Sequence, residues 1–280
     1  MRILRALILA GIASVHVSAA HAAQVAELSL SVQDPRPMER AVDRIVKRHQ
    51  LQVTYEDPPY IYSGDIRDVT TEVRRDLANY PPGQAPKVFA PKGGSIKLRY
   101  SVLSATSKPE QPVALLRNIV RAHEVSAAGA TFDVRESDGV IHVIPVSFRD
   151  ATGRLVPLSP VLDTVISLPA ANRSTIEALE ALCAAVTESA KVQVGMFTAP
   201  INLLSRNQFS EAVYNETARD VLTRILKSTQ RKLVWQLIYD VNTKLYGLNI
   251  QALPESTANS ASARPSSTSS PSSPIRPRQR

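Results

Sequence analysis

The sequence predicts an α+β fold made of two duplicated small domains, each with two helices packed on short mixed or antiparallel sheets. Three observations predict it. Residues 217–252 combine helical periodicity with two alternating strands. Residues 112–146 repeat that order about a hundred positions earlier. A strand–helix–strand pattern precedes both stretches, at 28–55 and 165–194. Two matching halves indicate duplication of one small unit.

The first half opens with a strand and an amphipathic helix. Apolar residues alternate from Leu28 to Val32, and Asp34-Pro35 is typical of a helix start. The helix ends near His49, and a strand from Leu51 to Tyr55 follows. Five positions form the apolar stripe of this helix. They are Met38, Ala41, Val42, Ile45 and Val46.

The first half closes with a strand, a second helix and a hairpin. Residues 96–100 alternate as a strand, and Pro112 opens the helix. Phe132 and Val134 precede Asp138-Gly139, and residues 140–144 follow it. Asp-Gly between alternating runs is a strong hairpin signal, so these runs should pair.

The second half repeats these elements after a polar turn at 149–153. Residues 165–168 form a strand, and Ser174 with Glu177 predicts a capping box for the next helix. Thr217 with Asp220 repeats that cap ahead of the last helix. The closing hairpin carries Leu233, Trp235, Leu237 and Tyr239 on one face, with Tyr246, Leu248 and Ile250 opposite. Trp235 is therefore expected in the core.

An insertion distinguishes the halves. The helix-to-helix spacing is 67 residues from Val46 to Val113 and 32 from Val186 to Ala218, so the first half carries about 35 extra residues within 57–94. A short helix is expected from Val69 to Tyr80. Long insertions are commonly functional. The candidate partner-binding residues are Tyr55, Tyr60, Tyr62 and Tyr80, and the alternative is that this loop packs on its own domain.

The two ends of the chain predict export. Residues 1–22 have a basic start, an apolar run and a small-residue cleavage site, as in a signal peptide, and no other run is long enough for a transmembrane segment in the mature chain. The domains are expected at 27–150 and 161–252, in a periplasmic or secreted protein. The Ser/Pro/Arg tail, 253–280, is expected to be disordered. It is interpreted either as a solubilising tail or as a weak contact with an anionic surface.

Neither the net charge nor any sequence motif indicates a particular chemical reaction. The formal charge is +8, but the signal holds two Arg and the tail four Arg and one Glu, so the folded part carries +3. A net charge this small excludes the strongly basic surface of a nucleic-acid-binding protein. No catalytic, cofactor-binding or metal-ligating motif is present, and His49, His123 and His142 lack metal-site spacing. The single cysteine, Cys183, lies on an apolar helix face and is interpreted as a buried structural thiol.

An acidic cluster follows the first strand–helix–strand unit. It contains Glu56, Asp57, Asp65 and Asp68. Their spacing fits neither a calcium loop nor a catalytic pair, so solubility and turn capping are the preferred interpretation.

The apolar pattern resembles the short N-terminal domain of secretins and of TonB-dependent outer-membrane receptors. Residues 51–55 match the strand after the first helix, and Ala218-Arg219-Asp220-Val221-Leu222 matches the start of the second helix. Residues 233–250 match the closing hairpin. Nothing in the chain corresponds to a secretin pore or a receptor barrel. The resemblance implies a periplasmic docking module, present as two tandem copies.

The function expected from these observations is non-enzymatic protein–protein docking in the cell envelope, with no cofactor. Two alternatives stay open. One is an accessory subunit of a secretin-type secretion or pilus machine. The other is an envelope enzyme or sugar-binding protein with a cleft between the domains.

Overall fold

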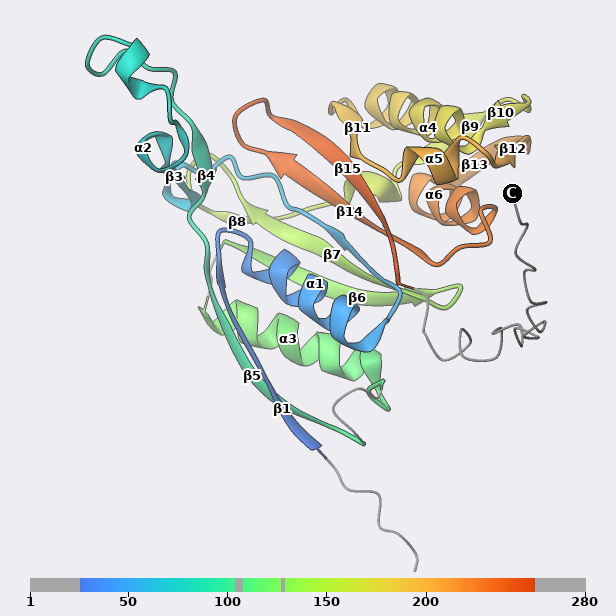
Figure 1. Cartoon of the computed structure of the whole chain (residues 1–280), viewed down its shortest axis with the longest axis horizontal. Helices are drawn as coiled ribbons and strands as arrows, with labels where there is room; N and C mark the ends of the chain where they lie inside the picture. Colours follow the sequence, from blue (N-terminus) through green and yellow to red (C-terminus); the bar gives the residue numbers. More distant parts are fainter. Residues whose placement is uncertain (1–25, 104–107, 127–128, 255–280) are drawn as a thin grey trace, which may run out of the picture.

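The computed structural model describes residues 26–103, 108–126 and 129–254 (Figure 1). The expectations for residues 1–22 and for most of the tail lie outside these ranges. Leu253, which the sequence pattern assigns to the tail, is 7% exposed and packs in a core. The protein is mixed α/β, with one large sheet and several two-stranded sheets. Within the described ranges no helix is long and apolar enough to cross a membrane.

The first half contains the predicted elements in the predicted order. Two strands form a separate ribbon with nine antiparallel residue pairs, and two helices lie between this ribbon and the large sheet (Figure 1). The elements are β1 (Ala26–Asp34), α1 (Pro37–His49), β2 (Val53–Glu56), β5 (Gly94–Val102), α3 (Pro112–Ser126), β6 (Ala130–Ser137) and β7 (Val140–Arg149).

The second half has the same kinds of element, with a capping box at Ser174 and Glu177 as predicted and Thr217 accepting from the Asp220 backbone N–H. The main elements are β9 (Val165–Leu168), α4 (Thr175–Ala190), β11 (Val194–Thr198), β13 (Val213–Thr217), α6 (Ala218–Lys227), β14 (Leu233–Asp240) and β15 (Leu245–Ala252). The sequence pattern did not predict the short pieces. They are β8 (Leu155–Pro157), η3 (Val161–Asp163), β10 (Arg173–Ser174), α5 (Ile201–Leu204) and β12 (Gln208–Phe209).

Strand pairing follows one scheme in both halves. β2 runs parallel to β7, and β7 is antiparallel to β6. Likewise β11 runs parallel to β15, and β15 is antiparallel to β14. β1 pairs with β5 as β9 pairs with β13, both antiparallel. Apart from β8 and the short pairs β3–β4 and β10–β12, each half thus supplies three strands to the large sheet and one two-stranded ribbon of its own.

The halves share the large sheet, whose order is β11-β15-β14-β2-β7-β6, with β8 beside β7. Its centre is the parallel pair β14 and β2, one strand from each half. On β14, Trp235 packs with the second-half helices, whereas Val234 packs with the first-half helices. Because neighbouring side chains on a strand point to opposite faces, the two helix pairs cover opposite faces of the sheet. The junction strands are therefore buried on both sides.

The insertion is a projecting arm rather than a helix (Figure 1). Its strands β3 (Ile66–Asp68) and β4 (Phe89–Pro91) pair antiparallel. The helix predicted over 69–80 is wrong: only α2 (Thr70–Val73) and η2 (Leu77–Asn79) form, with η1 (Ser63–Asp65) before β3. The extended backbone of Arg74 interrupts the helix between the two turns, and its side chain bonds Asp76 and Tyr80.

Candidate functional site

Two adjacent carboxylates lie inside the junction between the halves. Glu56 and Asp57 are 0% and 1% exposed. The interpretation of these two as solvated loop residues is wrong, because the second half covers the face of β2 that would otherwise meet water. The remainder of the acidic cluster behaves differently. Asp68 accepts the Thr70 backbone N–H at 2.9 Å, as a turn cap does, and Asp65 pairs with Arg149 at 3.1 Å.

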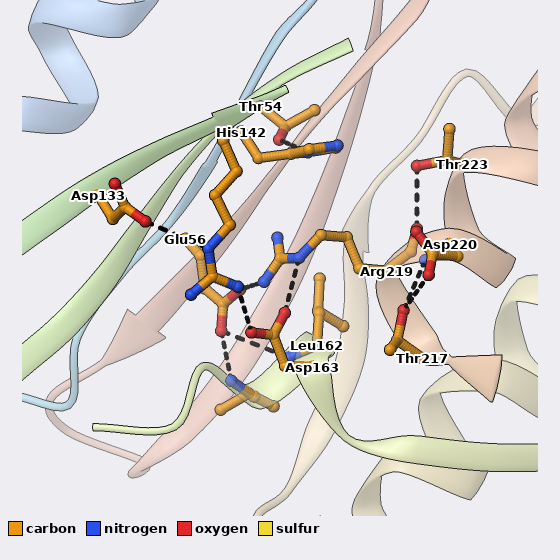
Figure 2. Close-up of polar contacts among 12 residues, drawn as sticks. Thr54, Glu56, Asp133, His142, Leu162, Asp163, Thr217, Arg219, Asp220 and Thr223 are labelled. Atoms are coloured by element: carbon orange, nitrogen blue, oxygen red, sulfur yellow. Dashed lines mark hydrogen bonds and ion pairs between the residues drawn. The ribbon is translucent and has the colours of Figure 1, made fainter. Parts of the chain in front are cut away.

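Glu56 joins the end of β2 to the second half (Figure 2). Its Oε2 accepts from Nη2 of Arg219 on α6 at 2.7 Å, and its Oε1 accepts the backbone N–H groups of Val161 and Leu162 in η3. Complete burial raises the pKa of Glu56, while Arg219 and the two backbone donors oppose that rise. Three donors from two segments far from β2 in the sequence thus meet at one carboxylate.

Arg219 extends this contact into a line of alternating charges (Figure 2). Its Nε donates to Asp163 at 2.9 Å, and Asp163 also accepts from Arg135 of β6 at 2.8 Å. The guanidinium of Arg219 lies 5.6 Å from the ring centre of Trp235. Trp235 is 2% exposed, so its predicted core position is confirmed.

Asp57 makes a second connection across the junction. Its carboxylate accepts from Arg36 Nε and from the Tyr55 hydroxyl, both at 2.7 Å, and from the backbone N–H of Tyr239 on β14 at 3.1 Å. The Asp57 backbone N–H donates to Leu237 O at 2.8 Å. Burial raises the pKa of Asp57, and Arg36 opposes the rise.

These contacts form an ionic clamp across the junction, made by Glu56 with Arg219 and Asp57 with Arg36. Every carboxylate oxygen of Glu56 and Asp57 already accepts at least one hydrogen bond. Buried pairs contribute little net stability, but removing one partner costs several kcal/mol. The clamp therefore fixes how the two halves meet.

The other titratable candidates are also buried. The Nδ1 atom of His142 lies 2.7 Å from the hydroxyl oxygen of Thr54, and burial lowers the pKa of His142 to about 4. Burial lowers the pKa of His123 to about 4 in the same way. Cys183 is 4% exposed, and burial raises its pKa to about 12, as expected for a structural thiol.

The four candidate tyrosines do not form one surface. Tyr55 is 1% exposed in the first core, so its assignment to a partner-protein contact surface is wrong. Tyr60 is half-buried and packs against the second core. Tyr62 is half-buried, and its ring centre lies 5.8 Å from the Arg149 guanidinium. On the arm, the ring centre of Tyr80 lies 4.9 Å from the Arg74 guanidinium. The arm itself packs on the β14–β15 turn, where Asn242 bonds both backbone groups of Phe89.

A free strand edge lies elsewhere, on β5. All nine residues of β5 pair with β1 on one side, and no strand of the described ranges pairs with the other side. A groove of about 320 Å³ runs between the end of β5 and the start of α3. Leu103, 44% exposed, stands at its rim. The groove is lined by residues 99–103, 109–111, 114, 115 and 118. Sequence patterns predict the strand, but not which of its edges stays open.

Comparison with known proteins gives no identification. No family model, curated protein or solved structure matches the chain.

Proposed function

We propose that this is an exported, non-enzymatic docking module of the cell envelope that binds an extended segment of a partner protein along β5. The observation that carries the proposal is the open nine-residue edge of β5 beside an apolar groove. Unpaired N–H and C=O groups along a strand are a template for an added strand. Main-chain hydrogen bonds would supply affinity, and the groove would select side chains.

The chemistry of the groove describes the segment it accepts. Leu103, Ala114 and Leu115 give it apolar walls, so the added strand should place apolar side chains there. Lys97 and Arg99 are exposed on the solvent side of β5. Opposite charges across neighbouring strands are favourable, so an acidic residue on the outer face of the partner strand fits best.

The resemblance to the short N-terminal domain of secretins and TonB-dependent receptors belongs to this proposal. The shared pairing scheme of the two halves supports duplication, with α1 corresponding to α4 and α3 to α6. The halves are not equivalent in docking. The β13–β9 ribbon has five residues in β13 and a break in register between Val213 and Glu216, so it offers a shorter edge than β5.

The test combines a blocked groove with a matched control. Ala114→Arg places a long cationic side chain in the groove on a helix that tolerates it. Val73→Asp changes a residue of the arm that is 55% exposed. Envelope proteins are cross-linked to each variant, and backbone amide exchange is measured on the purified complex. We expect Ala114→Arg to lose the partner, Val73→Asp to retain it, and amides of 94–102 to gain protection in the complex.

Two results would overturn the proposal. One is a partner retained by Ala114→Arg but lost by Val73→Asp, which would move the contact to the arm. The other is a complex in which β5 amides exchange as fast as in the free protein, because an added strand must protect them.

A further inference from the structure

A second concave site lies in the first half, away from the β5 groove. It has a volume of about 220 Å³. Its walls come from the loop before α1, the start of the insertion, the end of α3, the start of β6 and the end of β7. Six polar or aromatic residues define it. They are Tyr55, Tyr60, Asp65, Lys92, His123 and Arg149.

The floor of this pocket presents oxygen acceptors. The Tyr55 hydroxyl donates to Asp57 at 2.7 Å, and the Tyr60 hydroxyl points to the same carboxylate oxygen at 3.5 Å. Asp57 is held in turn by Arg36. Because both hydroxyl hydrogens are directed at Asp57, the hydroxyl oxygens keep lone pairs for a donor placed in the pocket.

One wall carries a buried nitrogen without a partner. His123 is 6% exposed, and its Nδ1 has no hydrogen-bond partner in the described ranges. Its ring stands edge-on to Phe132 at 5.3 Å. An unpaired buried polar atom is unfavourable, so a ligand that bonds this imidazole gains affinity.

The rim is cationic. Arg149 donates to Asp65 at 3.1 Å, whereas Lys92 is exposed and forms no ion pair with a described residue. The rim thus has two cations and one carboxylate. An anionic group on a ligand would meet Lys92 and the remaining donors of Arg149.

We propose that this pocket binds a small hydroxy acid, with hydroxyl groups donating to Tyr55 and Tyr60 and bonding His123, and with the carboxylate at Lys92 and Arg149. The volume is below the ~300–1,000 Å³ of pockets for drug-sized ligands, which restricts the ligand to a small metabolite. Neither a neutral polyol nor a simple carboxylate engages both the floor and the rim.

The experiment is titration calorimetry of the mature chain with gluconate, sorbitol and acetate. We expect saturable binding of gluconate and binding at least roughly tenfold weaker for sorbitol and acetate, because each lacks one set of hydrogen bonds. Lys92→Ala should weaken gluconate binding roughly tenfold, while Lys191→Ala, which removes an exposed lysine of the second half, should leave it unchanged.

Tyr60→Phe provides a second variant, since it removes one acceptor oxygen and keeps the ring. Thermal melts of each variant check that the fold is intact. No saturable heat with gluconate at millimolar concentration would overturn the proposal. So would equal binding of acetate and gluconate, or equal losses in Lys92→Ala and Lys191→Ala, which would indicate attraction by net charge alone. The outcome does not bear on docking at β5, which uses other residues.

Discussion

Arg219→Met tests whether the clamp holds the two halves together. Arg219 is 5% exposed and pairs with Glu56 at 2.7 Å and with Asp163 at 2.9 Å. Methionine keeps the unbranched stem that packs near Trp235 but leaves Glu56 buried without its cation. Breaking a buried pair on one side costs about 3–5 kcal/mol, so we expect a loss of that size in the free energy of unfolding.

A double variant separates the ion pair from packing. The double variant Glu56→Gln with Arg219→Met removes both charges. Its loss in the free energy of unfolding should be smaller, by about 1 kcal/mol or more, than the sum of the losses in the two single variants. The control is Arg67→Met, which breaks a pair whose side chains are 41% and 52% exposed. Its effect should stay within about 0.5 kcal/mol.

The assay is urea denaturation followed by fluorescence of the single tryptophan and by far-ultraviolet circular dichroism. Coincident transitions from both probes would indicate that the halves unfold together. A loss below about 1 kcal/mol for Arg219→Met, or strict additivity in the double variant, would refute the clamp.

Three further outcomes are expected. Trp235→Ala should lose roughly 3–5 kcal/mol in urea melts followed by circular dichroism, and a loss below about 1 kcal/mol would contradict its place in the core. Ser174→Ala should lose about 1 kcal/mol because it removes a capping box, and an unchanged midpoint would mean that the cap contributes nothing. His142, with a folded pKa of about 4 against 6.5, contributes stability that is complete above pH 6.5 and lost as pH falls toward 4. From pH 7.5 to pH 5, His142→Asn should therefore gain about 2 kcal/mol relative to wild type, and a pH-independent difference would show that His142 is not buried neutral.

Local patterns predicted most of the elements because their causes are local. The turn at Asp138-Gly139 joins Ser137 and Val140 as predicted. The capping box formed by Ser174 and Glu177 lies within the first turn of α4 and marks where this helix begins. Apolar spacing alone identified the buried stripe of α1. The exception lies in the insertion, where the extended backbone of Arg74 ends α2 at Val73, although periodicity favoured a helix to Tyr80.

The candidate site depended on contacts that no local pattern contains. Val53 and Tyr55 alternate with Thr54 and Glu56, so a strand covered on one face would leave the second pair in water. Arg219, which neutralises Glu56, is 163 positions away. An acidic residue directly after an apolar strand was the only signal, and it is equally typical of a loop.

The sequence by itself determined the four long helices, the hairpins, the order of the main elements and the position of the inserted segment, because propensity, capping and periodicity act over a few residues. Only the tertiary structure decided that β14 and β2 pair in parallel and so merge two halves into one sheet. That pairing places the helices on opposite faces and buries Glu56 and Asp57. The tertiary structure also pairs β5 with β1 alone, which leaves the other edge of β5 free. The reason is physical: whether a polar residue is buried or an edge is open depends on what packs against it, and those groups come from distant parts of the chain.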